Sequence, residues 1–141
     1  MTIKRHFALS LPIDGTQLHA LIDAARIACA QAYAPYSRFR VGAACLAASG
    51  RVYAGSNVEN ASYGLSICAE RAAIFHAVNA GERDIVAVAL YTPTPQPVSP
   101  CGACRQVMCE FGDAIEVIAA SDGDSVTRWT SGELLPARFK L

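Results

Sequence analysis

The sequence has no excess of charge of either sign. Among its 141 residues, 12 are Lys or Arg and 12 are Asp or Glu, so the formal net charge is zero. Proteins that bind long nucleic acids usually carry a basic excess, because the neutralisation of phosphates supplies most of their affinity. The composition therefore argues against a nucleic-acid polymer as a partner and favours a small ligand that is recognised locally.

Long hydrophobic runs are missing as well. No stretch reaches the roughly 18 apolar residues that suggest a transmembrane helix, so we expect no association with a membrane. Residues 7–11 are mostly apolar, but this stretch is shorter than the roughly 7–15 residues of a secretory signal core, and Pro12 and Asp14 interrupt it. We interpret residues 1–15 as an N-terminal arm and expect the protein to be cytoplasmic.

Internal repeats, linkers and low-complexity tracts are also missing. Hydrophobic residues make up 52% of the chain and charged residues 17%, which is typical of a globular protein and not of a disordered one. A chain of this length can bury a sizeable core without disulfides. We therefore expect one domain over residues 1–141.

The six cysteines are not expected to form disulfides. Without an export signal the reducing cytosol is the expected compartment, where closely spaced cysteines more often bind metal or take part in chemistry. We expect packing roles for three of them, Cys29, Cys45 and Cys109. The other three, Cys68, Cys101 and Cys104, are candidates for a functional site.

The spacing of apolar residues predicts helices that alternate with strands. Apolar residues recur at spacings of three and four from Leu18 to Ala32, and this pattern predicts a first helix. Thr16 is its predicted cap, and Pro35 lies beyond its end. Further helices are predicted at 68–80, 102–111 and 131–135, and strands at 41–47, 52–57, 85–91, 115–120 and 126–130. This order predicts an α/β fold, a three-layer α-β-α arrangement around a mixed five-stranded sheet.

Two cysteine motifs stand at the starts of predicted helices. Residues 68–71 read Cys-Ala-Glu-Arg, and residues 100–105 read Pro-Cys-Gly-Ala-Cys-Arg. The N-terminus of a helix stabilises a thiolate, so Cys68, Cys101 and Cys104 are candidate zinc ligands. Three protein ligands leave a fourth position for water, which is the pattern of a catalytic zinc site.

Glu70 is the candidate proton carrier. A carboxylate beside the metal that is not itself a ligand can take a proton from water and give it to a leaving group. Residues two apart lie about 200° apart around a helix, so Cys68 must stand at the very start of its helix if both are to reach one site. Three thiolates place negative charge on the metal and weaken it as a Lewis acid, so a positive charge nearby would help. Arg71 is the better candidate for this charge, and Arg105 is expected to be solvated.

Two other interpretations of the cysteines remain open. A structural zinc would need a fourth protein ligand, for which the candidates are His6, His19, His76, Cys45 and Cys109. A thioredoxin-like redox pair at Cys101 and Cys104 would leave Cys68 and Glu70 unexplained.

Taken together, the motifs match the pattern of the zinc deaminases that act on nucleobases, and the chain resembles the small, homotetrameric cytidine deaminases. The resemblance runs from about Tyr33 to Phe139, in segments 36–44, 57–64, 68–71, 99–107 and 134–136. It implies one zinc ion per chain, a nucleoside substrate, and hydrolytic deamination of cytidine and 2′-deoxycytidine in pyrimidine salvage. It also implies a homotetramer.

The resemblance further implies which residues contact the substrate. Asn57 and Glu59 would hold the sugar hydroxyls. They stand two apart at the end of a strand, so that both side chains can point to one face. A loop-capping role is the alternative for both. Phe39 and Tyr63 would contact the base, the backbone near Ala61 and Ala69 would hold its polar edge, and Phe139 would reach into a neighbouring subunit; for Phe39 and Phe139 a core role is the alternative.

Two functional alternatives remain. One is the deamination of a related compound such as blasticidin S, although the complete segment 57–64 favours cytidine. The other is a zinc-stabilised binding module without catalysis.

Overall fold

The computed structural model describes residues 13–141, and its first element is helix α1 (Gly15–Cys29). Asp14 caps this helix, because its side chain accepts a hydrogen bond from Gln17 N at 2.8 Å while the Gln17 side chain accepts one from Asp14 N at 3.1 Å. The predicted cap Thr16 is therefore wrong, and Gly15 belongs to the helix and not to the arm. Residues 1–12, the rest of the predicted arm, lie outside the described residues.

Helix α1 also ends earlier than the apolar stripe suggests. The N–H groups of residues 30–32 each bond to a carbonyl three residues back, which tightens the chain into turns. Tyr33 then pairs in extended conformation, donating to Asn57 O at 2.9 Å and accepting from Glu59 N at 2.8 Å. These contacts end α1 before Pro35. They also pair the chain at Tyr33 with residues 57–59, which follow β2.

The five strands form one mixed sheet, as the sequence predicts. They are β1 (Gly42–Ala47), β2 (Val52–Ser56), β3 (Ile85–Tyr91), β4 (Glu116–Ala120) and β5 (Thr127–Thr130), and their order across the sheet is β2-β1-β3-β4-β5. The pair β3 and β4 is parallel, with α3 (Gly102–Phe111) in the crossover between them, and the other pairs are antiparallel.

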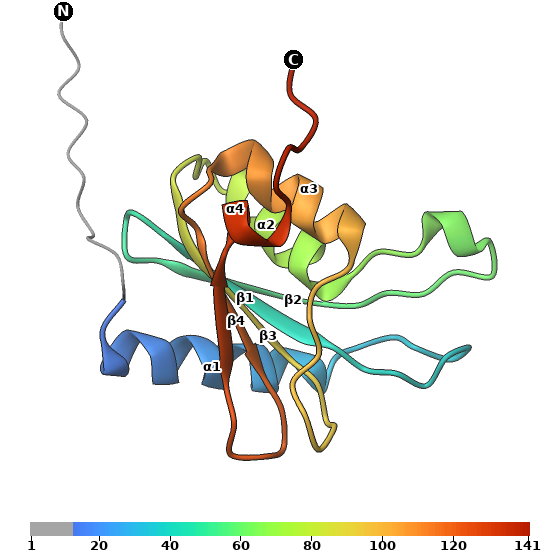
Figure 1. Cartoon of the computed structure of the whole chain (residues 1–141). Helices are drawn as coiled ribbons and strands as arrows, with labels where there is room; N and C mark the ends of the chain where they lie inside the picture. Colours follow the sequence, from blue (N-terminus) through green and yellow to red (C-terminus); the bar gives the residue numbers. More distant parts are fainter. Residues whose placement is uncertain (1–12) are drawn as a thin grey trace, which may run out of the picture.

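Helices cover both faces of this sheet (Figure 1). Helix α1 packs on one face, while α2 (Ala69–Asn79), α3 and the short α4 (Ser131–Leu134) lie on the other. Strand β3 is buried on both faces, with Val88 and Leu90 directed to the side of α2 and α3, and Ala87 and Ala89 to the side of α1. The three-layer prediction is thus confirmed. Within residues 13–141, none of the helices combines the length and the apolar character that a membrane crossing requires.

Two strand glycines let the helices approach the sheet closely. A Cβ atom on Gly42 would lie 1.9 Å from Ala25 O in α1, and one on Gly55 would lie 2.5 Å from Ala73 N in α2. Only a residue without a side chain permits such contacts between a strand and a helix backbone. Gly55 therefore fixes the position of α2, which begins at the cysteine motif described next.

Candidate active site

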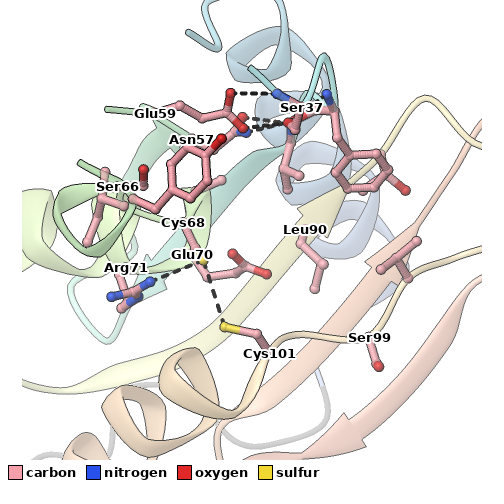
Figure 2. A pocket seen from close by; sticks show the side chains of 17 residues that line it. Ser37, Asn57, Glu59, Ser66, Cys68, Glu70, Arg71, Leu90, Ser99 and Cys101 are labelled. Carbon is pink, nitrogen blue, oxygen red and sulfur yellow. Dashed lines mark hydrogen bonds between the residues drawn. The ribbon is translucent and has the colours of Figure 1, made fainter. Parts of the chain in front are cut away.

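The site lies where α2 and α3 begin. Cys68 is the N-cap residue of α2 and Cys101 that of α3, and Cys104 stands in the first turn of α3. Neither cap side chain accepts a capping hydrogen bond from the backbone of its own helix, so both thiols are available to a ligand. The three sulfur atoms lie within 4.8 Å of one another, and Cys68 Sγ is 3.8 Å from Cys101 Sγ (Figure 2).

These distances fit a zinc ion. Zinc–thiolate bonds of about 2.3 Å in a tetrahedron place neighbouring sulfur atoms roughly 3.8 Å apart. Among the residues described, no other His, Cys, Asp or Glu belongs to this cluster, so it offers three protein ligands and leaves one position open. Within that part of the chain, nothing supplies the fourth ligand that a structural zinc would need; His6 lies outside it.

A guanidinium group stands beside the thiols. Arg71 Nη2 donates a hydrogen bond to Cys68 Sγ at 3.2 Å. The pKa of Cys68 is lowered to about 5, first by a hydrogen bond with Cys104 and then by those from Arg71 and Cys101, while partial burial opposes the shift. These hydrogen bonds thus favour the thiolate of Cys68, the form that binds zinc, whereas the hydrogen bond with Cys68 and burial raise the pKa of Cys104.

Glu70 lies beside the cluster and is nearly inaccessible to solvent. The residue is 4% exposed, and its Oε2 accepts a hydrogen bond from the Cys104 thiol at 3.6 Å. Burial raises the pKa of this carboxyl, and the negative charge of Cys68 adds to the shift. Cys68 stands at the helix start, as predicted, and this position lets Glu70 reach the same site.

A pocket of about 490 Å³ connects this cluster to the predicted substrate residues. Its size is within the usual range for small-molecule sites, roughly 300–1,000 Å³. Its lining includes Cys68, Glu70, Arg71 and Cys101 from the metal side, and Phe39, Asn57, Glu59, Tyr63 and Ala69 from the predicted substrate side. The predicted residues Ala61 and Phe139 do not line it.

Asn57 and Glu59 both bond to the loop that precedes β1. Asn57 Oδ1 accepts from Val41 N, and its Nδ2 donates to Phe39 O, both at 2.8 Å. Glu59 Oε1 accepts from the N–H groups of Tyr36 and Ser37 at 3.0 Å, and its Oε2 accepts from the Ser37 hydroxyl (Figure 2). The loop-capping bonds are therefore real, and they hold the loop that carries Phe39.

Exposed aromatic residues stand near the mouth of the pocket and at the C-terminus. Tyr63 is 76% exposed, and its ring meets the ring of Tyr36 edge-on, with ring centroids 6.1 Å apart. Phe139 is 71% exposed, so it has no core role within this chain. Its carbonyl accepts a hydrogen bond from Gln106 Nε2 at 3.2 Å.

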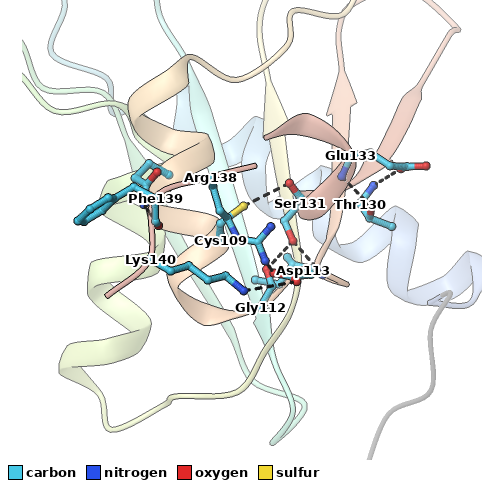
Figure 3. A network of polar contacts seen from close by, with 11 residues as sticks. Cys109, Gly112, Asp113, Thr130, Ser131, Glu133, Arg138, Phe139 and Lys140 are labelled. Carbon is cyan, nitrogen blue, oxygen red and sulfur yellow. Dashed lines mark hydrogen bonds and ion pairs between the residues drawn. The ribbon is translucent and has the colours of Figure 1, made fainter. Parts of the chain in front are cut away.

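Ion pairs hold the C-terminal segment against the end of α3. Arg138 and Lys140, the neighbours of Phe139, both pair with Asp113, which follows α3 (Figure 3). The backbone around Phe139 is therefore anchored although its ring is free.

Two residues contribute to the site in ways that the sequence patterns do not indicate. Arg105 was expected to be solvated, but its Nε donates to Pro100 O at 2.8 Å and its Nη1 to Leu134 O at 3.0 Å. It thus fixes the residue next to Cys101, and the expectation is wrong. Ser37 lies within the segment that carries the resemblance, but only the folded loop shows its contact with Glu59.

Comparisons with known proteins agree with this geometry. Residues 16–120 match the family model described as "Cytidine and deoxycytidylate deaminase zinc-binding region". The cytidine deaminase of Halalkalibacterium halodurans is 53% identical over 110 residues, which are 77% of this chain and 83% of the relative.

Solved structures agree as well. A cytidine deaminase from Burkholderia pseudomallei shares 51% identity with a TM-score of 0.83 over 86% of this chain and 98% of that one. One from Mycobacterium tuberculosis shares 40% identity with a TM-score of 0.78, over 92% and 100%. The chain belongs to the zinc-binding cytidine and deoxycytidylate deaminase family, and the resemblance predicted from its motifs is confirmed.

Proposed function

We propose that this protein hydrolyses cytidine and 2′-deoxycytidine to uridine and 2′-deoxyuridine, with release of ammonia and one zinc ion bound per chain. One observation carries the proposal: a single pocket joins Cys68 and Cys101, two of the three clustered thiols, and the buried Glu70 to Asn57 and Glu59. Relatives with 53% and 46% identity are named cytidine deaminases, which supports this choice of substrate.

Cys68, Cys101 and Cys104 would hold the zinc. When bound with one open position, zinc lowers the pKa of water to about 7 and so supplies a nucleophile at neutral pH. Arg71 offsets the negative charge of the thiolates through its contact with Cys68. The chain's own contribution is to orient the ligands from two helix starts and, at Cys68, to favour the thiolate by lowering its pKa.

Glu70 would move the protons. It takes one from the attacking water and delivers it to N3 of the cytosine ring as the new C–O bond forms at C4. It then carries the second water proton to the exocyclic nitrogen, so that the C–N bond breaks and ammonia leaves. Its burial serves this role, because burial raises the pKa of the carboxyl group and so helps it to hold and release a proton during turnover.

Asn57 and Glu59 retain the capacity to bind a sugar despite their bonds to the loop. An Asn amide carries two N–H donors, and Asn57 uses one of them for Phe39 O. A carboxylate offers about four acceptor sites, and Glu59 uses three, for Tyr36 N and for the N–H and hydroxyl of Ser37. One donor of Asn57 remains, together with one acceptor site on each of the two residues, which suits hydroxyls that both donate and accept.

The base would lie between the aromatic residues and the start of α2. Phe39 and Tyr63 line the pocket, and stacking on an aromatic ring is worth roughly 1–3 kcal/mol per base in other complexes. The N–H of Ala69, the first residue of α2, belongs to the helix end where backbone donors have no intrahelical partner, so it can bind a polar atom of the ring. The backbone at Ala61 would assist from the loop beside it.

We further propose that four copies of this single-domain chain assemble, with Phe139 entering a neighbour's pocket. The anchored backbone and free ring of Phe139 support this role. The cytoplasm would suit the site, because all six cysteines are free and the three ligands must stay reduced.

The test is a substrate panel. The loss of ultraviolet absorbance is followed with cytidine, 2′-deoxycytidine, cytosine, blasticidin S and cytidine monophosphate, and the zinc content and solution mass are measured on the same protein. We expect turnover of both nucleosides, poor turnover of the base and of the monophosphate, about one zinc per chain and a tetramer. A preference for the monophosphate would contradict the role of Glu59, because a carboxylate repels a phosphate.

A further inference from the structure

Ser37 lies between two residues of the proposed substrate pocket. Its hydroxyl donates a hydrogen bond to Glu59 Oε2, and its N–H donates to Glu59 Oε1 at 3.0 Å. The same hydroxyl oxygen accepts a hydrogen bond from the N–H of Phe39, also at 3.0 Å. Because a hydroxyl has a single proton, and the Phe39 N–H occupies its acceptor side, that proton is directed at Glu59.

We propose that Ser37 is a positioning residue that orients the Glu59 carboxylate toward the sugar hydroxyls of the substrate. The proposal rests on the proposed function, in which Glu59 binds the sugar. Glu59 is only partly buried, so packing alone does not fix its side chain. Hydrogen bonds from the side chain and N–H of Ser37, and then from Tyr36, also lower the pKa of Glu59 and keep it an acceptor at neutral pH.

The two carboxylate oxygens are held differently. Oε1 is held by two backbone N–H groups, those of Tyr36 and Ser37, which any residue at position 37 except proline would preserve. The contact from the loop to Oε2 comes from the Ser37 hydroxyl. Removal of this hydroxyl therefore leaves Oε1 bonded to the loop but removes the contact to Oε2. The carboxylate can then rotate about Oε1.

The chain provides a matched control for a Ser37→Ala variant. Ser49 donates its hydroxyl to a carboxylate oxygen of Glu82 at 2.6 Å and accepts from the N–H two residues later, that of Arg51, at 3.3 Å. This is the same local arrangement as at Ser37, and neither Ser49 nor Glu82 lines the pocket. Ser49→Ala thus removes an equivalent interaction without touching the site.

The experiment compares cytidine with 2′,3′-dideoxycytidine, which has no sugar hydroxyl at either position. For Ser37→Ala we expect kcat/KM for cytidine to fall about tenfold, mostly through a higher KM, since a hydrogen bond to a charged group is lost. With the dideoxy substrate we expect a change of less than about twofold. Ser37→Thr, which keeps the hydroxyl, is expected to restore most of the cytidine activity, and Ser49→Ala to behave as wild type.

The outcomes separate the proposal from the function on which it rests. An equal loss on both substrates, or no loss on either, would refute the positioning role of Ser37. If the wild-type protein itself turns over the two substrates equally well, Glu59 does not bind the sugar hydroxyls, and the positioning role of Ser37 is refuted as well. If cytidine is not deaminated at all, the proposed function is wrong. Melting temperatures of Ser37→Ala and Ser37→Thr, measured first, show that both variants are folded.

Discussion

The close packing of α2 on the sheet gives a sharp test of how the fold supports the site. In a Gly55→Ala variant the new Cβ atom would lie 2.5 Å from Ala73 N and 2.8 Å from Ala72 C. Both are backbone atoms and cannot rotate away. To restore ordinary contact, the backbone of α2 must retreat by about 1 Å from β2.

This displacement should affect both stability and activity. Overpacking of this kind costs roughly 1–3 kcal/mol, which for a chain of this size lowers the melting temperature by about 3–12 °C. Ala72 and Ala73 lie within one turn of Glu70, so the start of α2 moves as well. A misplacement of about 1 Å at reacting groups can reduce the rate about 100-fold, and we expect kcat/KM for cytidine to fall by a factor of that order.

The measurements are thermal unfolding and cytidine turnover below the melting temperature, with Gly15→Ala as the control. Nothing lies within 4 Å of a Cβ atom at Gly15, the first residue of α1. Alanine there should leave the stability unchanged or slightly higher, because glycine disfavours a helix. An unchanged melting temperature in Gly55→Ala would refute the packing argument. A lower melting temperature with normal turnover would show that the site tolerates movement of α2.

Substitutions at three further positions test individual roles. Glu70→Gln should keep about one zinc per chain and lose turnover by about 100-fold or more, and retained activity would remove Glu70 from proton transfer. Arg71→Gln should weaken zinc retention against a chelator or activity by about 10–100-fold, with Arg71→Lys intermediate because it keeps the charge but not the guanidinium; if both variants behave as the wild type, the contact with Cys68 has no role at the site. Phe139→Ala should lose activity alone but regain part of it when co-expressed with Glu70→Gln, since a mixed assembly contains some complete sites; failure to recover activity would argue that Phe139 does not act across subunits.

Most of the fold follows from local patterns. The strands are apolar runs of five to seven residues in β1, β3 and β4, and the cysteine motifs coincide with real helix starts. The error at α1 has a physical cause. Asp14 and Thr16 are both good cap residues, but only Asp14 has a Gln three residues later to complete a reciprocal cap, whereas His19 follows Thr16 at that distance.

Among the contacts of the site, those between residues close in the sequence could be predicted, and those between distant residues could not. The three thiols could be predicted because a C-x-x-C spacing and two helix starts are local features. The bond from Arg105 to the carbonyl of Leu134 spans 29 residues, and those from Ser37 to Glu59 span 22. No periodicity encodes such pairs, since they depend on how the loops meet after the sheet has formed.

Asn57 and Glu59 show why capping and substrate binding are not opposed interpretations of a polar residue. The capping bonds determine where the side chains point, and the donor and acceptor sites that remain determine what they can bind. Replacement of either residue would release the loop that carries Phe39 and remove a sugar contact at the same time. A substitution therefore cannot separate the two roles, whereas a substrate without the sugar hydroxyls leaves every protein bond in place and isolates the contribution of binding.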